Sequence, residues 1–224
     1  MNTLTLAENI RTAARTLRRK DPSLARVMRE VGPCLLQPNQ KQSPYESLVR
    51  AVAHQQLHGK AAETILARFV ALTPGKRFPT PLEVLKLKPE SLRGAGFSAA
   101  KVLSILDIAR HSQTGVVPSS RAVSKLDDEA LVDRLTEVRG IGRWTVEMLL
   151  IFHLGRPDVL PVDDFGIRSG FQAAYGLPEM PKPKALLAYG ELWRPHRTVA
   201  AWYLWRAADL AKTRIPLADR RPPR

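Results

Sequence analysis

The stretch that decides how this chain folds and what it does is VRGIGRWTVEMLLIFHLGRPDVLPVDDFGIRSG, residues 138–170. It begins with a glycine turn, Gly140-Ile141-Gly142, which leads into a pattern typical of a helix. Further along, two adjacent aspartates, Asp163 and Asp164, precede another helical pattern. Both features are common as helix turns and helix caps. The question is whether these residues also bind a substrate and act on it.

Apolar residues recur at helical spacing through most of the chain, which predicts about ten helices of ordinary length. Residues 5–18, 21–31, 98–111 and 127–138 are the clearest of them. The sequence Ser43-Pro44-Tyr45-Glu46 is a strong helix start, because Ser43 can cap and Glu46 can complete a capping box. We expect that helix to continue to about Phe69. The fragment DVLPV is the one strand-like pattern and it is short, so the predicted fold class is all-α.

The charge of the chain narrows the class of partner. Lysine and arginine together number 35 against 21 acidic residues, a formal net charge of +14 over 224 residues. Such an excess favours a polyanionic partner, above all nucleic acid. Cys34 is the single cysteine, so an internal disulfide and an iron–sulfur cluster bound by this chain alone are excluded. We see no secretory signal and no apolar run of membrane-spanning length, and we expect a soluble cytoplasmic protein without membrane contact.

The glycine turn has two interpretations. Gly140 and Gly142 permit unusual backbone angles and bring no side chain, so main-chain amides there can meet a phosphate oxygen directly. Arg139 and Arg143 flank the turn and add positive charge. The turn is then a helix-hairpin-helix that grips one DNA strand without reading its sequence. The alternative is a tight turn between helices with a glycine at its C-terminal cap.

The two aspartates also have two interpretations. Either Asp163 or Asp164 could cap the helix that follows, which is the usual role of aspartate at such a position. An ionised, partly buried carboxylate at that place would also suit a reaction that builds positive charge on a sugar. Cleavage of a glycosidic bond passes through such a state.

Aromatic and glutamine residues supply the remaining candidates. Trp144 follows the glycine turn, Trp205 lies on the last helical segment, and Tyr45 starts the helix at residue 44. Each could be an ordinary core residue, although tryptophan also stacks well on flat or cationic rings. Gln55 and Gln56 interrupt an apolar helical pattern, so they are either a solvent-exposed face or a plug that fills a gap in DNA.

Two histidines flank those glutamines. His54 and His58 have the spacing of a metal-binding pair on a helix, but no further ligand lies near them in sequence. We therefore expect surface or DNA groove residues and no catalytic metal.

Four segments together resemble the helix-hairpin-helix–Gly/Pro–Asp superfamily of DNA glycosylases, in its alkylpurine branch. The resemblance is carried, in order, by LVRAVAHQQLHGKAA (48–62), GFSAAKVLSILDIA (94–109), residues 138–171, and WRPHRTVAAWYLWR (193–206). It implies a compact region of two helical lobes. One lobe, about 44–125, would carry the helix whose side chain enters the DNA as a wedge, and the other, 126–206, would carry the hairpin and the loop with the catalytic aspartate. Residues 1–43 would pack on the lobes, and no extra N-terminal α/β domain is expected.

The resemblance also implies roles for single residues. Asp164 matches the catalytic aspartate, with Asp163 as the alternative. Trp144 stands where relatives with lyase activity carry a lysine, so hydrolysis without lyase activity is expected. Trp144, Trp205 and Tyr45 are expected to line the base pocket. Gln56 resembles the wedge that enters the DNA stack, with His58 beside it near the minor groove.

A function follows from the same resemblance. We expect a monofunctional glycosylase that flips alkylated purines, of the 3-methyladenine and 7-methylguanine type, out of double-stranded DNA and excises them. It would act as a monomer, without a cofactor except a monovalent cation at the hairpin when DNA is bound, and near the nucleoid. Two alternatives stay open: a glycosylase for uracil or oxidised bases, and a non-catalytic helix-hairpin-helix DNA-binding module.

Overall fold

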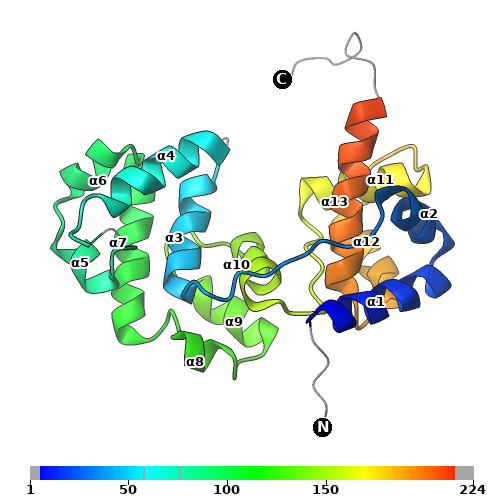
Figure 1. The fold of residues 1–224 in the computed structure, drawn as a ribbon, viewed down its shortest axis with the longest axis horizontal. Coiled ribbons are helices and arrows are strands. Elements are labelled where there is room, and N and C mark those ends of the chain that lie inside the picture. The colour runs from blue at the N-terminus through cyan, green and yellow to red at the C-terminus, as the bar shows by residue number, and fades with distance from the viewer. Residues whose placement is uncertain (1–5, 58, 76, 215–224) are drawn as a thin grey trace. The chain divides into compact units, whose positions relative to one another are not determined.

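The computed structural model of the chain describes residues 6–57, 59–75 and 77–214. These residues form helices and contain no β-strand, so the all-α prediction is confirmed. The chain divides into two compact units. Unit 1 combines the N-terminal segment up to Gln37 with the chain from Gly155 onward, and unit 2 comprises Pro38–Leu154. Figure 1 shows the helices of both units, coloured from blue at the N-terminus to red at the C-terminus.

The described residues of unit 1 form five α-helices and a short 3₁₀ turn. They are α1 (Leu6–Lys20), α2 (Pro22–Val31), α11 (Phe165–Tyr175), α12 (Pro183–Gly190), the 3₁₀ turn Glu191–Trp193 and α13 (Arg197–Arg214). Helix α11 lies directly against α13, as Figure 1 shows. A Cβ atom at Gly170 would come 1.8 Å from the carbonyl oxygen of Leu204, so only glycine allows this approach. The close contact places the start of α11 beside the side chains of α13.

A buried carboxylate joins three parts of unit 1. Asp21 is the N-cap of α2, where its Oδ1 accepts a hydrogen bond from Leu24 N at 3.0 Å. Its Oδ2 accepts from Trp193 Nε1 at 2.8 Å and from the hydroxyl of Tyr175. Asp21 is 0% exposed. Because burying a charged group is costly unless hydrogen bonds compensate, these donors make the position tolerable and tie α2 to α11 and the 3₁₀ turn.

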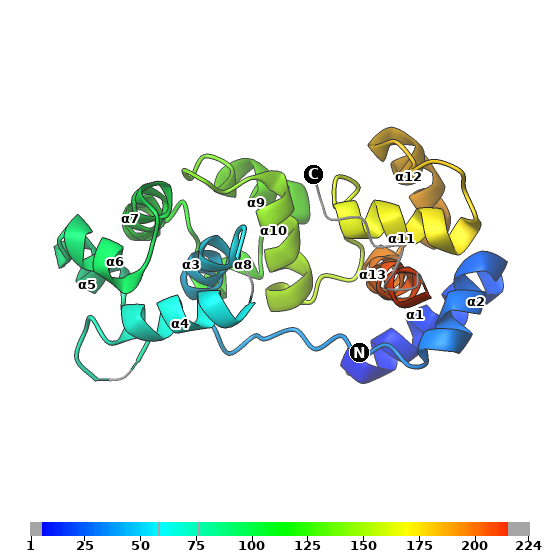
Figure 2. The same ribbon diagram turned by 90° about the horizontal axis from the view of Figure 1, so that it is seen from above.

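In unit 2, the residues that the structure describes form eight α-helices and one π-helical turn. They are α3 (Pro44–His54), α4 (Gly59–Val70), α5 (Pro81–Lys86), α6 (Pro89–Ala95), α7 (Ala99–Thr114), α8 (Ser120–Val123), α9 (Asp128–Leu135), α10 (Arg143–Leu149) and the π turn Leu150–Leu154. Helix α3 contacts α4, α7 and α10, and Figure 2 shows it among them. Its buried side chains, such as Leu48 and Val52, form the middle of the unit's core.

The prediction of one helix from Pro44 to about Phe69 is wrong. Helix α3 ends at His54 and α4 begins at Gly59. Between them Gln56 has a φ of +57°, the only positive φ of a non-glycine residue in the described parts of the chain. Left-handed backbone breaks a right-handed helix, and side chains adopt it only when their surroundings impose it. Gln56 and Leu57 are exposed in the resulting turn.

The predicted division near residue 125 also differs from the observed one. The hairpin, α9 and α10 belong to unit 2 together with α3 and α7. One reason is visible at the hairpin, where Arg139 N donates a 2.9 Å hydrogen bond to Asp107 Oδ2 on α7. Helices α1 and α2 pack on α13 within unit 1. No helix in the described part of the chain is long and apolar enough to cross a membrane.

Candidate functional site

The turn that carries the two aspartates ends at the N-terminus of α11, in unit 1. Asp164 N donates to Pro161 O at 3.1 Å, which closes the turn. Asp164 is the N-cap, and its Oδ1 accepts from Ile167 N at 2.8 Å. The carboxylate is therefore held at the end of the helix where the macrodipole favours an anion. Asp163 is exposed, whereas Asp164 is half-buried, so Asp164 is the carboxylate that the helix N-terminus fixes.

A tryptophan from α13 holds the same carboxylate. Trp205 Nε1 donates to Asp164 Oδ1 at 2.9 Å. The indole passes so close to the backbone of α11 that a Cβ atom at Gly166 would lie 2.9 Å from Trp205 Cδ1. Gly166 thus allows the ring to reach the carboxylate. The structure places the polar edge of Trp205 on Asp164, a contact that the sequence did not predict.

The hairpin in unit 2 packs against α7 and is hydrogen-bonded to it. Gly140 has a φ of +78°, and a Cβ atom there would come 2.3 Å from Ser104 Oγ. Asp107 Oδ2 accepts from Arg139 N, as described above. No side chain caps the N-terminus of α10, where Gly142 is the N-cap. The turn therefore presents main chain rather than side chains at this helix end, in the manner expected for a phosphate-binding hairpin.

The two arginines that flank the hairpin differ. Arg143 forms a double hydrogen bond with Glu129, with N–O distances of 2.7 and 3.1 Å. This bond raises the pKa of Arg143, and it fixes the guanidinium against α9. Arg139 is exposed, and its hydrogen bond to Asp107 uses its backbone N–H and not its side chain. The side chain of Arg139 is thus better placed than that of Arg143 to meet a phosphate.

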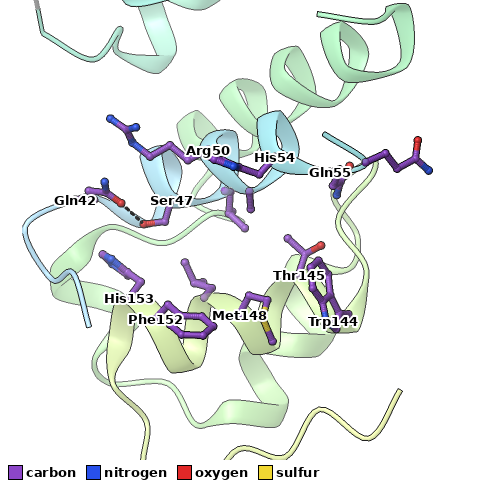
Figure 3. A pocket seen from close by; sticks show the side chains of 14 residues that line it. Gln42, Ser47, Arg50, His54, Gln55, Trp144, Thr145, Met148, Phe152 and His153 are labelled. Carbon is purple, nitrogen blue, oxygen red and sulfur yellow. Dashed lines mark hydrogen bonds between the residues drawn. The ribbon is translucent and has the colours of Figure 1, made fainter. Parts of the chain in front are cut away.

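A cavity of about 540 Å³ lies in unit 2, a volume in the range of small-molecule sites. Trp144, Met148 and Phe152 come from one helical run, and Ser47, Arg50 and His54 come from α3 opposite (Figure 3). Trp144 is 44% exposed and Phe152 is 41% exposed. Such exposed aromatic side chains beside a cavity offer faces on which a planar ring can stack. Gln55 and Gln56 lie at the same cavity.

Several of these cavity residues are absent from the sequence predictions. The stripe Trp144, Met148 and Phe152 has a four-residue spacing that a helical pattern would reveal, and this signal was available. The π-helical turn at residues 150–154 was not predicted from the sequence. Such turns occur often at functional sites.

Tyr45, which was predicted to line the base pocket, is a core residue and does not line this cavity. It is 7% exposed, and its ring packs edge-on against Phe78. Pro44 and Tyr45 at the start of α3 are both buried, because this end of the helix faces the core of unit 2. His58 lies outside the described residues. His54 is paired with Glu63 at 3.1 Å, and the described residues contain no cluster of His, Cys, Asp and Glu suited to a metal ion.

The fold and these turns define an all-α protein with a helix-hairpin-helix and, after it, an aspartate fixed at a helix N-terminus. Residues 49–195 match the model of the HhH-GPD superfamily of base excision DNA repair proteins. The chain belongs to this superfamily.

Individual relatives are similar over most of their length. The chain is 45% identical over 182 residues to DNA-3-methyladenine glycosylase 1 of Schizosaccharomyces pombe, covering 81% of this chain and 80% of the relative. A solved 3-methyladenine DNA glycosylase of the same yeast, in complex with abasic DNA, is similar with a TM-score of 0.80 at 44% identity, covering 89% of this chain and 98% of the other. A DNA-3-methyladenine glycosidase of Bacillus halodurans has a TM-score of 0.79 at 33% identity, covering 90% and 91%.

Proposed function

We propose that this protein is a DNA glycosylase that hydrolyses the N-glycosidic bond of alkylated purines in double-stranded DNA and leaves an abasic site, as a step of base excision repair. The observation that carries the proposal is the fixed carboxylate of Asp164, held by Ile167 N and by Trp205 Nε1. Relatives named 3-methyladenine DNA glycosylases support the substrate class.

The chemistry needs only one carboxylate. Alkylation at N3 or N7 gives the purine a positive charge, so the base leaves with the electron pair of the C1′–N bond and becomes neutral. The sugar then carries the positive charge of an oxocarbenium-like state. Asp164 would stabilise that charge, because a preorganised ion needs no reorganisation at the moment of reaction. Water forms the new C1′–O bond, and its proton passes to the carboxylate or to solvent.

Trp144 supports both the base recognition and the absence of lyase activity. A lyase needs an amine that forms a Schiff base with the sugar, and the residue after Arg143 in this chain is Trp144. Its exposed ring can stack on the excised base, with additional attraction when that base is cationic. We propose a role for Trp144 in base binding on this ground.

DNA binding is assigned to the turns of unit 2. The hairpin at Gly140 and Gly142 would hold a phosphate through main-chain amides, with Arg139 adding charge. Gln56, exposed in its left-handed turn, would enter the stack when the damaged nucleotide rotates out. A monovalent cation at the hairpin when DNA is bound, action as a monomer and a place near the nucleoid remain predictions of the sequence analysis.

The decisive experiment is an assay of base release. Methylated duplex DNA is incubated with the purified chain, and free 3-methyladenine and 7-methylguanine are measured together with abasic sites. We expect both bases to appear without strand cleavage and without covalent trapping by borohydride. Release of uracil or 8-oxoguanine from defined duplexes, in place of alkylated purines, would contradict the substrate class. Binding without any release would indicate a non-catalytic module.

A second experiment tests the hairpin. Arg139→Ala should weaken binding to damaged and undamaged duplexes alike, because phosphate contacts carry no sequence information. The backbone hydrogen bond to Asp107 survives this change, so the hairpin should stay folded. A loss confined to damaged DNA would contradict the phosphate-binding role.

A further inference from the structure

The turn between α3 and α4 is held from outside itself. Gln55 has φ and ψ of −53° and 126°, and Gln56 follows with a φ of +57°. Leu57 N donates to His54 O at 3.2 Å, a local backbone bond across this turn. A left-handed glutamine is unfavourable by itself, so its surroundings must stabilise it. We call residues 54–57 the wedge turn.

Lys101 on α7 provides such support. Its Nζ donates to Ala53 O at 2.9 Å and to Gln55 O at 2.8 Å. These carbonyl groups lie at the C-terminal end of α3, where the helix itself leaves oxygens without partners and where the macrodipole favours a cation. Burial lowers the pKa of Lys101, in keeping with an ammonium group that has left water for these two acceptors. One side chain thus fixes the backbone on both sides of residue 54.

The same face of α7 also holds the hairpin. Lys101, Ser104 and Asp107 are three residues apart and therefore lie along one side of the helix. Ser104 lies under Gly140, and Asp107 accepts the hydrogen bond from Arg139 N. The wedge turn and the hairpin accordingly rest on one helix.

A direct bond joins the two turns as well. Gln55 Nε2 donates to Gly140 O at 3.2 Å. The backbone that carries Gln56 is therefore tied to the hairpin by Gln55 and to α7 by Lys101. Two turns that would each contact DNA keep a constant spacing only if such ties hold.

We propose that Lys101 is a positioning residue for base extrusion: it locks the wedge turn on α7 so that Gln56 meets the DNA stack at a fixed distance from the phosphate held by the hairpin. The inference rests on the proposed function, in which Gln56 is the wedge. Lys101 itself touches neither the substrate nor the reacting atoms.

A double-mutant cycle tests the proposal, with Lys101→Met and Gln56→Ala alone and together. The readout is the single-turnover rate of 7-methylguanine release from a duplex. We expect Lys101→Met to slow release about tenfold, since small misplacements of a positioned group have effects of this size or larger. In the Gln56→Ala background the same change should alter the rate less than about twofold, because coupled residues are not additive.

Lys125→Met is the matched control. Lys125 is exposed in unit 2, and its removal deletes the same charge without touching the wedge turn. It should change the release rate less than about twofold, and both methionine variants should bind undamaged duplex alike. If Lys101→Met proves unstable in thermal unfolding, Lys101→Gln takes its place, because it keeps an N–H donor on a shorter stem.

The outcomes distinguish the positioning role of Lys101 from the wedge role of Gln56. An equal slowing by Lys101→Met in both backgrounds would overturn the positioning role and leave the wedge role of Gln56 intact. A normal release rate for Gln56→Ala would overturn the wedge assignment, and the inference with it. Base release by the unchanged protein establishes the activity independently of both.

Discussion

Two aspartates of unit 1 have nearly the same local geometry. Asp21 caps α2 and Asp164 caps α11, and each accepts a hydrogen bond from the amide three residues later. Each also accepts from a tryptophan indole, Trp193 in one case and Trp205 in the other. One is 0% exposed, whereas the other is half-buried.

The difference lies in how far the two carboxylates are exposed. At Asp21 the amide binds Oδ1, while the indole and the hydroxyl of Tyr175 bind Oδ2, and the whole residue is enclosed. At Asp164 the amide and the indole bind Oδ1, and the residue is only half-buried. The same cap is thus a structural device when the protein surrounds it and a candidate reactive group when part of it faces water. The predictions below are designed to separate these two roles.

The largest expected effect is that of Asp164→Asn on catalysis. The carbonyl oxygen of asparagine can keep both hydrogen bonds now made by Oδ1, so the fold should remain, but the negative charge is gone. Base release should fall about a thousandfold, the scale of losing a preorganised electrostatic group. Single-turnover release and lesion binding would both be measured. Asp163→Asn should stay near the unchanged rate; the opposite ranking would show that Asp163 is the catalytic residue.

The next effect is that of Asp21→Asn on stability. The NH₂ group of the new asparagine would face the indole N–H of Trp193 and the hydroxyl of Tyr175. All three groups are hydrogen-bond donors, so these hydrogen bonds would be lost. The free energy of unfolding should fall by about 3 kcal/mol, which lowers the melting temperature by about 6–12 °C for a chain of this size. Thermal and denaturant unfolding measure this. The release rate per folded molecule should not change, and a large rate loss would contradict a purely structural role.

The two tryptophans should differ in the same way. Trp205→Phe removes the donor to Asp164 and should slow base release about tenfold through a less well oriented carboxylate. Trp193→Phe removes a donor to the buried Asp21 and should lower the free energy of unfolding by about 2 kcal/mol. Trp202→Phe is the control on α13, since Trp202 packs against Tyr203 and Arg206, whereas the indole donors to the two aspartates are Trp193 and Trp205. An effect of Trp202→Phe on release equal to that of Trp205→Phe would contradict the specific role.

The smallest effects are expected at the hydroxyl groups of two tyrosines. Tyr175→Phe removes a donor to Asp21 and should cost about 1 kcal/mol of stability. The hydroxyl of Tyr45 is buried and has no hydrogen-bond partner among the described residues. Tyr45→Phe should therefore leave stability within about 0.5 kcal/mol, or raise it, and should leave base release unchanged. A loss of release on this change would restore Tyr45 to the base pocket.

Much of the site could be predicted because its signals are local. The glycine turn, a capping aspartate at position 163 or 164 and a tryptophan after the hairpin all depend on residues within one or two helical turns. The break at Gln56 could not be predicted in this way. Its left-handed backbone is stabilised by Lys101, which lies on another helix, so the local pattern, which favoured a continuous helix, was overridden.

The lobe boundary was misplaced for a related reason. The sequence order places the hairpin near the catalytic loop, but the hydrogen bond between Arg139 and Asp107 places it with α7 in unit 2. Tyr45 is likewise an aromatic residue of the type that can line a base pocket, and only its packing against Phe78 shows that it belongs to the core.

By itself, the sequence determined that the chain is all-α, that a hairpin precedes a capping aspartate, and that Trp144 rather than a lysine follows Arg143. These properties depend on helical periodicity and on caps that reach three residues along the chain. Only the tertiary structure decided which aspartate is structural and which faces water, and how the wedge turn is fixed. Those distinctions depend on donors such as Trp193, Trp205 and Lys101, which come from distant parts of the chain and meet their acceptors only after the helices pack.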